Sequence, residues 1–198
     1  HEPDIVNRLA AVFHDIGKPR TRRFEPGGKV SFHHHDVVGA KMAAKRMQAL
    51  HFSSEETKAV ATLVELHLRF HGYAEGEWTD SAVRRYVRDA GDQLERLHIL
   101  TRSDCTTRNQ RKAQNLRRAY EELEWRIDEL AQREELNAIR PDLDGTQIME
   151  LLGIPEGREV GQAYRFLMEL RMEEGPLGQE RATRELLAWW AERHPGDG

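Results

Sequence analysis

Cysteine is nearly absent from this sequence, since Cys105 is the single example among 198 residues. One cysteine cannot form an internal disulfide, so a disulfide-stapled fold is excluded, and a reducing compartment fits this composition. The sequence also lacks any run of about 20 apolar residues, which a membrane-spanning helix needs, and shows no signal peptide. Tandem repeats and low-complexity segments are missing as well. We therefore expect a cytoplasmic protein without membrane contact.

The chain as a whole has no large excess of acidic or basic residues, and its formal net charge is -4. The distribution is uneven, however: residues 1–140 carry 24 basic and 22 acidic side chains, whereas residues 141–198 carry 6 and 12. A surface that binds phosphate groups is therefore expected in the first part. Charged residues make up 32% of the chain and apolar residues recur at helical spacing, which predicts an all-α fold.

The apolar periodicity predicts a series of helices along the chain. The first is expected over residues 3–17, ended by Gly17 and Pro19, and is followed by a loop or small hairpin around the Pro-Gly-Gly of TRRFEPGGKVSFH. The longest is expected over about 107–139, with an apolar seam for a partner helix and Pro141 as its stop. The remaining helices are predicted over about 35–50, 54–70, 78–91, 92–104 and 158–174, with a short one starting at Asp144 or Thr146 and a last one around Trp189.

The sequence changes character near Pro141, where IRPDLDGTQIMELLGIPEGREVG brings several turn-forming residues together. We therefore predict two parts. Residues 1–140 would form a helical bundle that contains the long helix, and residues 141–198 a small helical tail subdomain.

His14 and Asp15 stand side by side at the end of the first predicted helix, in LAAVFHDIGKPRTRRF. The pair alone is a weak signal, and a buried core histidine beside a helix-end aspartate is the alternative explanation. Adjacent helical residues point about 100° apart, so the two would share an ion only in a crevice to which other helices also contribute. Residues of ligand type that other predicted helices could contribute are His33, His34, His35, His67, His71 and Asp104.

These residues resemble the pattern of the HD-domain metal-dependent phosphohydrolases. HDIGK, the H-x-x-x-G-A at His35 to Ala40, His67 on a later helix and Asp104 on another carry the resemblance. It implies that His14, Asp15 and Asp104 are core metal ligands and that His35 and His67 complete this site or a second one. His33, His34 and His71 have no secure counterpart. The upstream histidine of the family pattern, some two or three dozen residues before the pair, also has none, since His1 is at the wrong distance.

The order of the motifs narrows the resemblance. LAAVFHDIGKPRTRRF, VSFHHHDVVGAKMAAKRM, WTDSAVRRYVRDAG, LTRSDCTTRN and the segment after Pro141 are similar to the C-terminal portion of bacterial CCA-adding tRNA nucleotidyltransferases that carry an HD domain. The polymerising head of those enzymes has a Gly-Ser motif and an Asp-x-Asp metal site, and nothing here matches either. The resemblance implies a tRNA-binding body and tail without that head.

The same resemblance implies phosphoester hydrolysis at the metal site, with Asp15 and Lys18 as catalytic residues and a nucleotide or other phosphoester as substrate. A mixed nitrogen and oxygen ligand set suits a divalent ion such as manganese, nickel, cobalt, iron, zinc or magnesium and does not choose among them. Two other functions stay open: a stand-alone HD-family nucleotide phosphohydrolase, and a non-catalytic RNA-binding module.

Two basic runs flank the predicted metal site. One follows the His-Asp pair and the other covers residues 101–120, where Asp104 is the single acidic residue. Each run alone would suit a solvated helix face, but two of them beside one site favour phosphate contacts, because arginine binds phosphate oxygens bidentately. The residues predicted to contact RNA phosphate are Arg20, Arg22, Arg102, Arg108, Arg111, Lys112 and Arg117.

Overall fold

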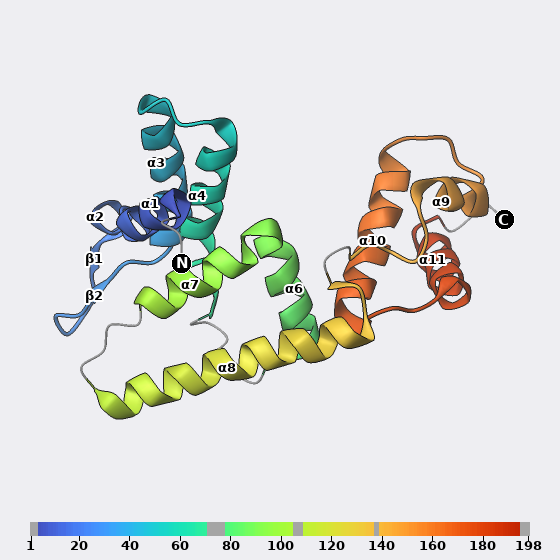
Figure 1. The fold of residues 1–198 in the computed structure, drawn as a ribbon. Coiled ribbons are helices and arrows are strands. Elements are labelled where there is room, and N and C mark those ends of the chain that lie inside the picture. Colours follow the sequence, from blue (N-terminus) through green and yellow to red (C-terminus); the bar gives the residue numbers. More distant parts are fainter. Residues whose placement is uncertain (1–3, 71–77, 105–108, 137–138, 195–198) are drawn as a thin grey trace. The chain divides into compact units, whose positions relative to one another are not determined.

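The computed structural model of the chain describes residues 4–70, 78–104, 109–136 and 139–194 (Figure 1). Apart from one antiparallel pair of two-residue strands, the regular structure within these ranges is helical, which confirms the all-α prediction. In the pair, β1 (Arg23–Phe24) lies beside β2 (Val30–Ser31), so the sequence around Pro-Gly-Gly forms the expected hairpin. None of the described helices is long and apolar enough to cross a membrane.

The helices follow the predicted order, with differences at their ends. They are α1 (Ile5–Phe13), α2 (Lys18–Thr21), α3 (His35–Ala49), α4 (Ser54–Leu66), α6 (Asp80–Ala90), α7 (Leu94–Asp104), α8 (Gln110–Arg133), α9 (Gly145–Leu152), α10 (Arg158–Glu174) and α11 (Gln179–Arg193), with the 3-10 turn η1 (Gly91–Gln93) before α7.

The described residues form two compact units. The first is drawn from residues 1–78 and 89–125, and the second from residues 79–88 and 126–198. The division of the chain at residue 140 into a helical bundle and a tail remains a prediction about domain organisation.

The first unit is built around α4, which packs against α1, α3 and α7. Ser53 fixes the start of α4, because its hydroxyl accepts a hydrogen bond from the Glu56 amide and its own amide donates to the Glu56 carboxylate, a capping box. Val60, Leu63 and Val64 are fully buried. Because α4 contacts three other helices, its last residues lie where side chains from several elements can meet.

The first predicted helix is wrong at its end. The sequence indicated one helix over 3–17, but α1 stops at Phe13, and a turn over residues 14–17 leads into α2. Pro19 does not terminate a helix here but lies in the first turn of α2, where its missing N–H is not needed. His14 keeps helical dihedrals as the C-cap of α1, and Asp15 follows it in the turn, with Asp15 Oδ2 3.4 Å from His14 Nε2.

The long helix α8 is also shorter than predicted. It ends at Arg133, well before Pro141, and the next residue, Glu134, is buried between two arginines. Its predicted seam is confirmed where it lies in the core: Tyr120 and Leu123 are buried, and Tyr120 stacks on Phe70 with ring centroids 3.8 Å apart. This part of the seam therefore packs into the core of the first unit.

The second unit has its own apolar core. It is formed by Leu143, Ile148, Ala163, Leu167, Ala182 and Leu186, from α9, α10, α11 and the segment before them. Of the two starts that the sequence offered for α9, Asp144 is the N-cap, and it forms a capping box with Gln147. Trp189 packs against this core and stacks on Phe166 with ring centroids 5.0 Å apart, so its role is core packing.

Candidate metal centre

The structure brings together the five residues predicted to bind a metal. His14 and Asp15 come from the turn after α1, His35 from the first residue of α3, His67 from the end of α4 and Asp104 from the end of α7. Four separate elements of the first unit thus contribute to one cluster, as a shared ion would require.

The carboxylates lie between the imidazole rings. His14 Nε2 is 3.4 Å from Asp15 Oδ2 and 3.2 Å from Asp104 Oδ1. His35 Nε2 is 3.3 Å from Asp15 Oδ1. The ring of His67 lies 5.4 Å from that of His14 and 5.3 Å from that of His35, measured between centroids. One ligand atom each from Asp15, His35 and His67 lie within 4.8 Å of one another.

All three imidazoles are oriented by the same local contact. The Nδ1 atoms of His14, His35 and His67 lie 2.7, 2.8 and 2.6 Å from the backbone carbonyl oxygens of the residues three positions earlier, Ala11, Phe32 and Val64. A carbonyl oxygen can only accept, so each Nδ1 carries the proton. In the neutral imidazole the lone pair is then on Nε2, which faces the carboxylates.

With this tautomer, imidazole Nε2 lone pairs face carboxylate oxygens at the centre of the cluster, and both groups are hydrogen-bond acceptors. Nε2 of His35 and Nε2 of His67 are buried and have no hydrogen-bond partner among the described residues. A lone pair of neutral His35 opposite a carboxylate oxygen 3.3 Å away is repulsive unless a positive charge lies between them. The arrangement therefore fits a divalent cation, and the backbone contact at Nδ1 is the usual way in which metal-binding histidines are oriented.

Burial and neighbouring charges keep the ligand groups in the forms that bind a cation. Burial lowers the pKa of His67, although the hydrogen bond to Val64 acts in the opposite direction, so this ring is held neutral. Burial works to raise the pKa of Asp15, but it is outweighed by the hydrogen bond from Lys18 Nζ, 2.6 Å from Oδ2, and by nearby histidines. The pKa of Asp15 is lowered, so its carboxylate stays ionised.

Gly17, just after the His-Asp pair, lies directly on α3 at Gly39. A Cβ atom at Gly17 would be 2.1 Å from the carbonyl oxygen of His35 and 2.8 Å from the amide nitrogen of Gly39, both backbone atoms that cannot move aside. His34, just before α3, adopts a left-handed conformation with φ of 61°. The close approach places Asp15 against His35, which is why glycine stands at position 17.

Of the three consecutive histidines, only His35 is buried, whereas His33 and His34 are exposed. His71 lies outside the described residues. The sequence analysis missed the carbonyl groups that fix the rings, because backbone acceptors leave no mark in the residue pattern.

The residues predicted to contact phosphate lie in different surroundings. Arg102 is paired with Glu124 at 2.5 Å, and Arg22 lies over the ring of Phe24. Arg111 is exposed on α8, and Arg117 lines a cavity of about 340 Å³ together with Arg102. Arg108 and the side chain of Lys112 lie outside the described residues. The remaining one, Arg20, is exposed on α2 and lines a larger cavity.

Comparison with known proteins agrees with this site. Residues 3–109 match the family model of the HD domain. Over 192 residues the chain is 37% identical to a CC-adding tRNA nucleotidyltransferase of Thermus thermophilus, covering 96% of this chain and 41% of that protein. Over 198 residues it is 33% identical to an A-adding tRNA nucleotidyltransferase of Deinococcus radiodurans, covering 98% of this chain and 44% of the relative. The chain thus spans less than half the length of these two relatives.

Proposed function

Since the chain belongs to the HD-domain family, we propose that it is the HD-domain and RNA-binding portion of a tRNA nucleotidyltransferase and that its histidine-aspartate cluster hydrolyses phosphoesters with a divalent metal ion. The similarity to a CC-adding and an A-adding enzyme over nearly the whole chain supports the first part. The geometry of the cluster supports the second.

One observation carries the hydrolytic proposal: imidazole lone pairs face carboxylate oxygens at 3.2–3.4 Å, as at His14 with Asp104. The residues that would hold the ion are His14, Asp15, His35, His67 and Asp104. Such a nitrogen and oxygen set suits manganese, nickel, cobalt, iron, zinc or magnesium. A divalent ion bound there would supply the Lewis acidity that phosphoester hydrolysis needs.

Lys18 has two roles in this proposal. Its ammonium group donates to Asp15 Oδ2 at 2.6 Å and so orients the carboxylate, leaving Oδ1 toward His35. Its side chain is 39% exposed, so the same positive charge is accessible to a phosphoryl oxygen and would stabilise the negative charge that develops there. Asp15 is thus a ligand and Lys18 a charge-neutralising neighbour of the reacting group.

Removal of the metal tests the hydrolytic proposal. The purified chain is expected to contain a divalent metal and to hydrolyse a generic phosphodiester or 2′,3′-cyclic nucleotides. Dialysis against a chelator should abolish hydrolysis, and added manganese, nickel or cobalt should restore it, because the buried Nε2 atoms then regain their cation. Metal content by elemental analysis and release of the product are the measurements.

Two results would count against hydrolysis. Activity that survives complete removal of the metal would place the chemistry elsewhere. Bound metal without cleavage of any phosphoester would favour a non-catalytic RNA-binding module instead.

The tRNA-binding part predicts that the exposed arginines of α8 contact phosphate. The double substitution Arg111→Gln and Arg117→Gln should weaken tRNA binding by about 1 kcal/mol and lower the salt dependence, with a change of up to about 2 in the slope of log affinity against log salt. Titration of labelled tRNA at several salt concentrations measures both. The pair Arg8→Gln and Lys58→Gln, exposed on α1 and α4, removes the same charge as a control. Equal slopes in the two variants would show that Arg111 and Arg117 are merely solvated.

A further inference from the structure

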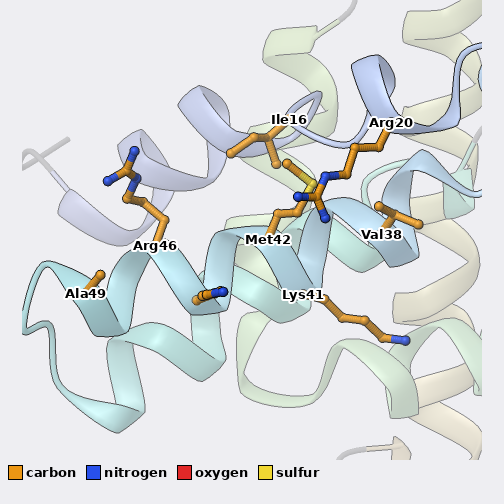
Figure 2. Close-up of a pocket in the computed structure, with 8 residues that line it drawn as sticks. Ile16, Arg20, Val38, Lys41, Met42, Arg46 and Ala49 are labelled. Carbon is orange, nitrogen blue, oxygen red and sulfur yellow. The ribbon is translucent and has the colours of Figure 1, made fainter.

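A second cavity of the first unit lies along α3 and has no role in the metal centre. Its volume is about 520 Å³, within the range of ligand-binding clefts. Figure 2 shows its lining: Arg20 extends from α2 over the groove, and the other basic side chains project from α3. The lining residues, which we call the α3 groove, are Ile16, Arg20, Val38, Lys41, Met42, Lys45, Arg46 and Ala49.

The charge of the α3 groove is entirely positive. Four of its eight residues are cations, and no acidic residue lines it, in a chain whose net charge is -4. Arg20, Lys41, Lys45 and Arg46 are exposed, and none of them makes an ion pair with another described residue. Some exposed arginines elsewhere are paired, as Arg181 is with Glu174. The groove thus holds a concentration of positive charge that the fold itself does not neutralise.

The floor of the α3 groove is apolar, being formed by Ile16, Val38, Met42 and Ala49. It contains no aromatic ring on which a base could stack, and none of its side chains carries a hydrogen-bond acceptor that could read the edge of a base. A ligand would therefore be recognised by its charge and shape. Repeated anionic groups joined by less polar spacers satisfy both the cationic rim and the apolar floor.

The groove follows the helix that also carries a residue of the metal centre. His35 begins α3, and Val38, Met42, Arg46 and Ala49 follow on the same side at steps of three and four residues. At 1.5 Å per residue, Lys41 and Arg46 lie about 7.5 Å apart along the axis. Together with Arg20 from α2, these cations can contact more than one phosphate group, which suits a polymer.

We propose that the α3 groove binds the sugar-phosphate backbone of RNA, with phosphates on Arg20, Lys41, Lys45 and Arg46 and riboses over the apolar floor. The choice of RNA as the polyanion rests on the proposed function. A membrane fits less well, because the opposite side of α3 is fixed in the core by Ala40, Ala43 and Met47 and the surface in question is concave. A mononucleotide with a single phosphate would leave some of the four cations without an anionic partner.

The test compares the chain with the triple variant Lys41→Gln, Lys45→Gln and Arg46→Gln. Glutamine keeps the helix propensity and most of the side-chain stem while removing the charge. With labelled tRNA and labelled poly(U), we expect affinity to fall at least about tenfold at 0.1 M salt and the salt slope to decrease by about 2, since about 0.7 of a counterion is released for each single-strand phosphate contact. A Lys41→Arg and Lys45→Arg variant should bind like the unmodified chain.

Two controls accompany the triple variant. Arg8→Gln, Lys29→Gln and Lys58→Gln remove the same two lysines and one arginine from exposed positions outside the groove and should leave RNA affinity within about twofold. Hydrolysis of a small phosphodiester should be unchanged in the groove variant, because none of its substitutions touches the metal centre. Circular dichroism checks that both triple variants are folded.

The outcomes separate this inference from the proposed function. Loss of poly(U) and tRNA binding in the groove variant alone supports the groove. Binding of poly(U) through the groove without binding of tRNA would overturn the tRNA partner and keep the groove. Equal losses in both triple variants, or RNA binding that neither changes, would overturn the groove. The groove would also be overturned as an RNA site if the groove variant lost binding of AMP or of anionic phosphatidylglycerol vesicles but kept binding of RNA.

Discussion

An Asp15→Asn chain is expected to lose its metal and its hydrolytic activity while remaining folded. Asp15 lies within the cluster and contacts Lys18 beside it: its Oδ1 faces His35, and its Oδ2 faces His14 and Lys18. Asparagine has nearly the same shape but no negative charge, so three lone-pair donors would remain without the anion that helps to hold a cation. We expect at least about a 100-fold loss of metal affinity, beyond the effect of losing an outer-shell partner.

The measurements are metal content by elemental analysis and hydrolysis of a generic phosphodiester. Asp92→Asn is the matched control, because it removes one negative charge from an exposed aspartate of the same unit, in η1. It should keep both metal and activity. If Asp15→Asn and the unmodified chain retain equal metal under the same dialysis, the cation is not held by this cluster.

The members of the cluster could be predicted from the sequence because their types and order are characteristic. His14, Asp15, His35, His67 and Asp104 are all residues that bind metals, and each lies next to a helix end or in a helix with a clear apolar period. Helix ends of a bundle converge, so residues at such positions can meet. Their roles as ligands remain a prediction that the experiments above test.

The geometry of the cluster could not be predicted. The helix α1 ends at Phe13, four residues before the glycine that contacts the backbone of α3, and neither Gly17 nor Pro19 shows by itself where the helix stops. The orientation of the imidazoles depends on backbone carbonyls, which are present at every position of every sequence. The imidazole contacts are local, to the residue three positions earlier, and neither feature leaves a mark in the residue types.

The α3 groove could not be predicted from the sequence for a different reason. Lys41, Lys45 and Arg46 are visible in the sequence as cations at helical spacing, but the same pattern describes any solvated helix face. What distinguishes the groove is the apolar floor to which Ile16 contributes from outside α3, and the lack of ion pairs with described residues. Both are properties of the folded chain.

The residue that follows the end of α8 belongs to a buried ion network of the second unit, which the sequence did not predict. Glu134 accepts from Arg84 Nε at 3.0 Å and from Arg171 at 2.5 Å, so it joins α6 to α10. The side chains of these three residues are only 3–6% exposed. Arg84 also donates to the backbone oxygen of Met172 at 2.9 Å. The carboxylate thus neutralises two guanidinium groups that have little access to water.

Glu134→Ala is therefore expected to be the most destabilising of the substitutions considered. It would leave Arg84 and Arg171 buried without the carboxylate between them, and breaking a buried pair in this way costs about 3–5 kcal/mol of the free energy of unfolding. Urea denaturation measures the loss, and hydrogen exchange of the α10 amides assigns it to the second unit. Glu169→Ala is the control, because Glu169 pairs with Arg85 at the surface and should cost less than about 1 kcal/mol.

The loss of stability in Glu134→Ala would come from the unpaired charges of the two arginines rather than from the loss of a strongly favourable ion pair. A further variant separates these two causes. Desolvation offsets much of the attraction within a buried pair, so replacing all three residues with apolar ones of similar volume should restore most of the stability. We expect the Arg84→Met, Glu134→Leu and Arg171→Met triple variant to be more stable in urea than Glu134→Ala alone. If the triple variant is instead the less stable of the two, the network itself stabilises the second unit through hydrogen bonds such as that from Arg84 to Met172, which methionine cannot make.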